Sequence, residues 1–246
     1  MPADSNPLVI LESVDSTNNY AMAQVHSGNA SDGNAWFAMG QTAGKGRQGK
    51  IWKTEKGQNI AESIVISASF LKVFEQFQLS VAVALGCVDF FKTHHNVFIK
   101  IKWPNDLFWD DRKAGGILIE NVVRNNIWQW AVIGIGININ QTMFPIDLGK
   151  PVSLKQITGE TYDVANAGKQ LYTAVTDRIK YLKTNGFKLM LEEYNNNLYK
   201  KDETVKLRKA NAIFETTITR VSQFGKLQTL DTIPREFDFD EVEWLL

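Results

Sequence analysis

Short apolar runs and one longer segment with helical spacing divide the first half of the chain. Runs rich in β-branched and aromatic residues predict four strands, at 8–12, 35–40, 59–70 and 97–103. A Ser/Thr cap predicts a helix over 16–24. From 78 to 95, apolar residues recur at helical spacing, which predicts a second and longer helix.

Two further apolar runs lie close together in the middle of the chain. They read "GGILIENVV" (115–123) and "IWQWAVIGIGINI" (127–139), and the turn residues between them predict a β-hairpin. Helical segments are predicted over 163–186 and 187–198. Three successive strands preceded by a long helix predict an α+β domain, in which a mixed β-sheet has helices packed on one face.

The pattern changes after Leu198. Strand-like runs then follow at close spacing, over 203–210, 212–222, 226–230 and 241–246. Short strands at this spacing are typical of a small β-barrel. We therefore divide the chain into a larger domain over 1–198 and a small C-terminal β-barrel domain over 199–246.

Composition excludes several classes of function. Lysine plus arginine equals aspartate plus glutamate, at 27 each, so no overall positive field favours nucleic acid. The single cysteine, Cys87, rules out a disulfide framework. The start of the chain lacks a secretory pattern, and the apolar runs are shorter than a membrane span. We therefore expect a cytoplasmic protein that binds neither DNA nor a membrane.

The stretch "GQTAGKGRQGKIW" (40–52) concentrates positive charge on flexible backbone. It holds four glycines and the cations Lys45, Arg47 and Lys50, contains no acid, and ends on Trp52. Glycine allows backbone N–H groups to converge on an anion, and a phosphate would offset the repulsion among the cations. The alternatives are a flexible surface hairpin for the loop and a core position for the tryptophan.

Two further motifs border the predicted hairpin. "KWPND" ends at Asp106 and has the composition of a turn, so a purely structural role is the alternative for this acid. Lys113 precedes Gly115 and Gly116, where the lack of side-chain bulk allows a ligand to approach, although a solvated strand-end lysine is the alternative. In "GIGININ", Asn138 follows two glycines, so this strand either borders a ligand or ends in a polar bulge.

Taken together, these motifs resemble those of the biotin protein ligases, also called biotin–acetyl-CoA-carboxylase ligases. The motifs, in the family's order, are "STN" (16–18), "GKGRQGKIW" (44–52), "KWPND" (102–106), "RKAGGIL" (112–118) and "GIGININ" (134–140). The joint match covers nearly the whole chain and is far more specific than any single motif. It implies a catalytic domain like that of class II aminoacyl-tRNA synthetases and a C-terminal SH3-like barrel. It also implies a monofunctional type, lacking the N-terminal DNA-binding domain of some relatives.

The resemblance implies a role for each matched residue. The residues implied for biotin are Ser16, Thr17, Gln41, Gly44, Lys45, Lys113, Gly116 and Ile117. The residues implied for ATP are Arg47, Lys50, Trp52, Asn105, Asp106 and Asn138. The implied catalytic residues are Lys113, which would bond the biotin carboxylate and the α-phosphate, and Arg47, in the loop that would close over both ligands. Metal ligands stay unassigned, and several roles are open for Asn105 and Asp106.

The activity implied by the resemblance is ATP-dependent ligation of biotin to a lysine of a biotin carboxyl carrier protein. The reaction would pass through biotinyl-5′-AMP and use Mg²⁺. A lipoate–protein ligase of the same superfamily and a non-catalytic biotin-binding regulator are the alternatives, and a homodimer is left open. Two departures from the family stand at Lys45, where many relatives have arginine, and at Gln48, where they have a basic residue. Lysine keeps the charge but loses the bidentate geometry, which predicts a weaker hold on phosphate.

Overall fold

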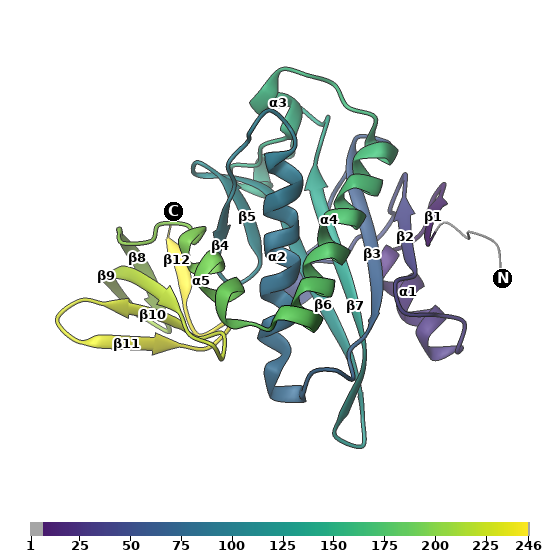
Figure 1. The fold of residues 1–246 in the computed structure, drawn as a ribbon. Helices are drawn as coiled ribbons and strands as arrows, with labels where there is room; N and C mark the ends of the chain where they lie inside the picture. The colour runs from purple at the N-terminus through teal and green to yellow at the C-terminus, as the bar shows by residue number, and fades with distance from the viewer. Residues whose placement is uncertain (1–6, 246) are drawn as a thin grey trace.

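The computed structural model describes residues 7–245, apart from the side chain of residue 147, and they form two β-sheets and five α-helices (Figure 1). The larger sheet contains β1 (Leu8–Leu11), β2 (Ala35–Ala38), β3 (Asn59–Ser67), β4 (Lys100–Lys102), β5 (Asp106–Trp109), β6 (Arg112–Arg124) and β7 (Ile127–Asn138). The helices are α1 (Thr17–His26), α2 (Gln76–Lys92), α3 (Leu154–Thr158), α4 (Val164–Asn185) and α5 (Lys188–Asn196). The smaller sheet contains β8 (Thr204–Lys209), β9 (Ala212–Val221), β10 (Leu227–Leu230), β11 (Pro234–Phe237) and β12 (Glu243–Leu245).

The larger sheet has the strand order β1-β2-β3-β7-β6-β5-β4. β1 and β2 are parallel and the other neighbours are antiparallel, so the predicted mixed sheet is confirmed. The predicted hairpin forms β6 and β7, and β3 pairs along β7. As a result Gly136 of β7 has Ala61 of β3 on one side and Gly116 of β6 on the other. Small residues therefore meet at the middle of the sheet.

The sequence analysis did not predict β5, α3 or β11. β5 and β11 have four residues each and α3 has five, and such short elements leave too few positions for a periodic pattern. β5 also follows directly on the turn of "KWPND", which was recognised only as a turn. The turn thus connects two paired antiparallel strands, β4 and β5.

Helices cover both faces of the larger sheet. α2, α4 and α5 lie together on one face, as predicted (Figure 1). α1 lies on the opposite face, where Ala21 packs with Trp36, Val65 and Val132, so the expectation of helices on one face holds for α2, α4 and α5 but not for α1. The alternation of side chains along β3 separates the two cores, because Val65 faces α1 while Ile64 faces α2 and α4.

Val73–Lys92 is long and apolar enough to cross a membrane, judged by length and composition alone. This corrects the sequence analysis, in which the apolar runs were judged too short for a span. In the fold, this segment contains α2, and Leu79, Leu85 and Cys87 are fully buried in the core against the sheet and α4. Packing in the core accounts for its apolar composition.

The smaller sheet is antiparallel, with the order β11-β10-β9-β8-β12. Together, the two sheets confirm the predicted fold class, an α+β domain followed by a small C-terminal β domain. Trp103 connects the two, because its Nε1 donates to the carbonyl of Gly225 at 2.8 Å and its ring centre lies 5.4 Å from that of Phe239. The predicted boundary between 198 and 199 falls between α5 and β8 and stays a prediction.

Glu62 is a buried acid on the face of β3 that packs against α2 and α4. Its side chain has no exposed surface, and neither carboxyl oxygen has a hydrogen-bond partner among residues 7–245. Burial raises the pKa of Glu62 well above its ordinary value. Cys87 of α2 and Tyr172 of α4 lie near Glu62. Burial raises the pKa of each of these two groups, and the charge of Glu62 raises it further.

We expect Glu62→Gln to stabilise the protein increasingly as the pH rises. The unfolded chain ionises this acid near pH 4.5, whereas the folded chain resists its ionisation. The stability contributed by the protonated acid is therefore full below about pH 4.5 and is lost as the pH rises toward the folded pKa. Relative to the natural chain, the free energy of unfolding of the variant should increase by about 1–3 kcal/mol between pH 5 and pH 8.

Urea unfolding of both proteins at several pH values measures this difference. Glu192→Gln, at an exposed acid on α5, is the matched control and should show no such trend. A difference between Glu62→Gln and the natural chain that stays constant with pH would contradict the assignment.

Candidate active site

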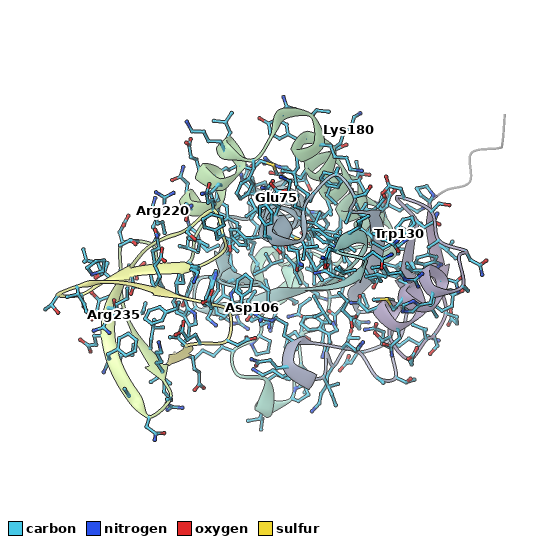
Figure 2. The ribbon with its side chains drawn as sticks, turned by 90° about the horizontal axis from the view of Figure 1, so that it is seen from below. Glu75, Asp106, Trp130, Lys180, Arg220 and Arg235 are labelled. Atoms are coloured by element: carbon cyan, nitrogen blue, oxygen red, sulfur yellow. The ribbon has the colours of Figure 1, made fainter. Side chains whose placement is uncertain are left out.

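A cavity of about 70 Å³ lies on the face of the larger sheet that carries α1. Loop 40–52, the start of α1, the turn before β5, and strands β6 and β7 surround it. The predicted site residues that line it are Ser16, Thr17, Gln41, Lys45, Arg47, Trp52, Asn105, Asp106, Lys113, Gly116 and Ile117. Figure 2 shows Asp106 on the side of the sheet away from α4, the helix that carries Lys180. The fold thus brings together residues from motifs that are far apart in the sequence.

One end of the cavity is polar. The backbone N–H and the hydroxyl of Thr17 donate to Gln41 Oε1, at 2.8 and 3.2 Å. Ser63 Oγ lies 2.8 Å from Thr17 Oγ1 and 2.6 Å from Asn18 Oδ1. Ser16 is buried at the N-cap of α1, where the first backbone N–H groups of a helix lack partners within the helix. This end therefore offers both hydrogen-bond donors and acceptors to a small polar group.

Lys45 reaches the same network through an acid that the sequence analysis missed. Lys45 Nζ lies 2.9 Å from Glu120 Oε1, and Glu120 Oε2 accepts from Asn18 Nδ2 at 2.8 Å. Asn18 is the third residue of the "STN" motif, and this motif is the feature of the sequence that could have indicated its place in the site. Ser63 and Glu120 lie in strands whose local sequence carried no signal, and only the fold brings them into contact with Thr17, Asn18 and Lys45, which line the cavity.

Three glycines leave space for larger groups around the cavity. A Cβ at Gly134 would lie 2.2 Å from Asn18 Oδ1, and one at Gly44 would lie 2.4 Å from the carbonyl oxygen of Trp52. A Cβ at Gly136 would lie 2.4 Å from Trp52 Cε2, so the indole rests directly on β7. The indole forms part of the cavity wall, and its Nε1 is buried with no hydrogen-bond partner in the described part of the chain.

An ion pair marks the opposite end of the cavity. Lys113 Nζ lies 2.6 Å from Asp106 Oδ1. Gly116 leaves room beside the pair, because a Cβ there would lie 3.6 Å from the amine and 3.5 Å from the carboxylate oxygen. Asn105 Nδ2 donates to the carbonyl of Ile117 at 2.8 Å, and the Ile117 N–H donates to the Asn105 carbonyl at 2.9 Å. These two bonds hold the turn before β5 against β6.

Arg47 connects the glycine-rich loop to the smaller sheet. Its Nη2 lies 2.8 Å from both carboxylate oxygens of Asp240, and its guanidinium carbon lies 5.6 Å from the ring centre of Phe239. Arg47–Gly49 form a single 3₁₀ turn, inside which Gln48 has φ +54°. The loop is therefore held across the two sheets by one charged contact.

A larger groove, about 1030 Å³, continues from the cavity toward the smaller sheet. The predicted residues that line both spaces are Arg47, Trp52, Asn105, Asp106 and Lys113. Lys50 and Asn138 line the groove. Gly44 lies in the glycine-rich loop and lines neither the cavity nor the groove. Asn138 Nδ2 donates to the carbonyls of Val152 and Lys113, at 3.1 and 3.3 Å, so this amide holds the backbone next to the site. The side chains that the structure describes include no group of three or more His, Cys, Asp or Glu arranged to hold a metal ion.

Residues 10–138, just over half of the chain, match the model of the biotin/lipoate A/B protein ligase family. The chain belongs to this family. The matched segment contains the first four of the five sequence motifs and the start of the fifth. It therefore supplies α1, the glycine-rich loop and β3 to β7, which enclose the cavity of this biotin/lipoate A/B protein ligase family member.

Curated relatives of this family member are longer than the part that it matches. The bifunctional ligase/repressor BirA of Bacillus spizizenii is 30% identical over 192 residues, which are 76% of this chain and 59% of that protein. The biotin–[acetyl-CoA-carboxylase] ligase of Mycobacterium tuberculosis is 30% identical over 143 residues, which are 57% of this chain and 52% of that protein. The chain thus spans between half and three-fifths of these two relatives.

The fold of this family member is shared with solved structures over almost its whole length. The structure of the Aquifex aeolicus biotin protein ligase in complex with biotin and ATP matches with a TM-score of 0.82 and 24% sequence identity. The match covers 97% of this chain and 98% of the Aquifex chain. The smaller C-terminal sheet is therefore part of the shared architecture.

Proposed function

We propose that this protein ligates biotin to a lysine of an acceptor protein, using ATP and forming biotinyl-5′-AMP on the way. The observation that carries the proposal is the junction of a small polar-ended cavity with a cationic groove at Lys113. The cavity suits a small ring with an apolar chain, because Thr17 and Gln41 lie at one end and Ala61 and Leu118 line its wall. The groove suits phosphates. Membership in the family supports the same assignment.

In the first half-reaction, an oxygen of the biotin carboxylate attacks the α-phosphorus of ATP. A new O–P bond forms, and the bond to pyrophosphate breaks. The reacting groups are all anions, so positioning and charge stabilisation are the main contributions of the protein. Lys113 lies where the cavity meets the groove, and its ammonium would contact the carboxylate and the α-phosphate together. Arg47 would contact the phosphates from the loop.

Mg²⁺ belongs to the proposal as a companion of the nucleotide. This ion is usually held by one or two carboxylates together with substrate phosphates, so the lack of a larger acidic cluster among the described residues fits it. Asp106 is the acid that lines both the cavity and the groove and would be its protein ligand. When bound, the ion would offset the negative charge of the phosphates.

In the second half-reaction, the neutral amine of an acceptor lysine attacks the carbonyl carbon of the adenylate. An amide bond forms, AMP leaves, and the amine loses its proton. We propose a biotin carboxyl carrier domain as the acceptor, and the name of the Mycobacterium relative supports this class of acceptor. No covalent bond to the enzyme is needed, which agrees with the full burial of Cys87. The proposal places this activity in the cytoplasm, without a DNA or membrane partner.

Incubation with biotin, Mg-ATP and a biotin carboxyl carrier domain tests the proposal. Intact mass of the carrier should increase by one biotinyl group, and the reaction without ATP should leave the carrier unchanged. Binding of biotin without any transfer would instead favour a non-catalytic regulator.

Lipoate is the second candidate substrate, because the description of the family includes lipoate ligases. Competition between biotin and lipoate in adenylate formation separates the two. We expect pyrophosphate release to depend on biotin, and a preference for lipoate would transfer the assignment to a lipoate–protein ligase.

Trp52→Ala and Gly136→Ala should both raise the KM for ATP far more than the KM for biotin. Trp52 is proposed to stack on adenine, and an alanine Cβ at 136 would lie 2.4 Å from the indole and must displace it. Because stacking of a base on an aromatic side chain contributes about 1–3 kcal/mol, we expect an increase in the ATP KM of about tenfold or more. Steady-state pyrophosphate release measures both constants.

Gly40→Ala is the matched control for the glycine variant, since its Cβ would meet only the flexible side chain of Lys56 at 3.4 Å. This control should leave both KM values unchanged. Equal loss of affinity for both substrates in the Trp52 variant, or its unfolding, would favour a core role for the indole.

A further inference from the structure

Lys102, the last residue of β4, lies in the groove but has no role in the activity derived above. Its ammonium lies 5.1 Å from the ring centre of Phe108 and 5.5 Å from that of Trp244, so two aromatic rings flank it. Phe108 belongs to β5 and Trp244 to β12 of the smaller sheet. A charged amine is thus held in place at the junction of the two sheets.

Several of the other cations around the cavity and groove have carboxylate partners, whereas Lys50, which also lines the groove, has none among the described side chains. Lys45 pairs with Glu120, Arg47 with Asp240, Lys113 with Asp106, and Arg208 with Glu243. Among the described side chains, which are those of residues 7–146 and 148–245, no carboxylate lies within ion-pair distance of the Lys102 ammonium. This amine therefore faces the groove without an anion of its own.

The local charge favours an incoming anion. Burial lowers the pKa of Lys102; Asp106 opposes this effect, while Lys113 and Lys50 add to it. Asp106 lies 2.6 Å from Lys113 Nζ, so this acid already has a cationic partner. Lys113 and Lys50 thus repel the Lys102 ammonium, and phosphate oxygens would relieve this repulsion.

Strand register gives the position of Lys102 relative to the cavity. Lys102 of β4 pairs with Asp106 of β5, and Asp106 pairs with Gly116 of β6. Neighbouring strands lie about 4.8 Å apart, so the backbone of Lys102 is about 10 Å from that of Gly116. Lys102 therefore lies two strands away from Gly116 of the cavity, on the far side of Asp106 and toward the groove.

We propose that Lys102 binds the β- and γ-phosphates of the nucleotide, the part that leaves as pyrophosphate. This inference rests on the proposed function, in which the biotin carboxylate and the α-phosphate meet at Lys113. A triphosphate that continues from there into the groove brings its terminal phosphates to the Lys102 ammonium. Phe108 and Trp244 orient the amine, so the smaller sheet supplies one wall of the phosphate site.

Lys102→Met tests this role, because methionine keeps most of the apolar stem and removes the charge. Calorimetric titration of ATP, ADP and AMP into the natural chain and the variant should show a loss of about tenfold or more for ATP, a loss for ADP, and a change of less than about twofold for AMP. Lys102→Arg, which keeps a cation, should restore most of the ATP affinity. Lys100→Met is the matched control, since its amine contacts the carbonyl of Asn196 outside the groove.

Two outcomes would overturn the inference. Unchanged ATP affinity in Lys102→Met would remove Lys102 from the phosphate site. Equal losses for ATP and AMP would mean that the lysine only supports the packing of the groove. The proposed function is tested by a separate experiment. If it is wrong, the natural chain transfers no biotin to the carrier, and this result does not depend on the nucleotide affinities.

Discussion

Replacing Lys113 with alanine should slow adenylate formation by about a hundredfold or more, because one charged contact to the transition state is lost. The ammonium lies where the cavity meets the groove, beside a strand entrance kept open by Gly116. Its ion pair with Asp106 is partly exposed, so its removal should lower the free energy of unfolding by less than about 1 kcal/mol. Biotin-dependent pyrophosphate release measures the rate, and thermal unfolding checks the fold.

Lys155→Ala, at a lysine of α3 outside both the cavity and the groove, serves as the control and should keep full activity. Near-normal pyrophosphate release by Lys113→Ala, with an intact fold, would remove this lysine from the reaction. The strand-end position would then be its whole role.

Replacing Arg47 with glycine should allow biotinyl-5′-AMP to escape from the enzyme. Lys113 remains, so adenylate should still form, but the loop loses the guanidinium that would hold it to phosphate. The free adenylate would acylate exposed lysines of any protein present. We expect biotin on an added non-substrate protein to rise about tenfold or more, measured by blotting with labelled streptavidin.

Asp240→Asn separates two explanations for such a leak. Arg47 contacts Asp240 through both carboxylate oxygens, so loss of this ion pair alone would also release the loop from the smaller sheet. If Arg47 retains the adenylate by contacting phosphate, Asp240→Asn should leak little. If both variants leak equally, the contact with the smaller sheet is what keeps the loop closed. An Arg47 variant that leaks no adenylate would show that this loop is not the lid.

The smaller sheet thus takes part in the candidate site from two directions. Asp240 holds the glycine-rich loop, and Trp244 forms a wall beside Lys102. Phe239 packs against Trp103 and lies beside Arg47. Removal of the C-terminal sheet would therefore disturb the groove as well as the stability of the chain.

The sequence by itself determined the central elements and the main candidate residues. The alternation along 59–70 and in the hairpin 115–139 predicted β3, β6 and β7, and the helical spacing over 78–95 predicted α2. These patterns are local, because burial of one face imposes its period on neighbouring residues. The glycines and cations of loop 40–52 likewise indicated an anion site from the sequence alone.

Only the tertiary structure decided which charges face one another. Lys45 and Glu120 are 75 residues apart, and Arg47 and Asp240 are 193 residues apart, yet each pair is in contact. The partner of a charge depends on strand register and on how the smaller sheet packs against the larger one, and no local pattern encodes either. For the same reason, although Lys102 begins the "KWPND" motif, the sequence gives no sign of what its amine faces. Its position in the groove follows from its pairing with Asp106 and from the packing of Trp244 over its amine.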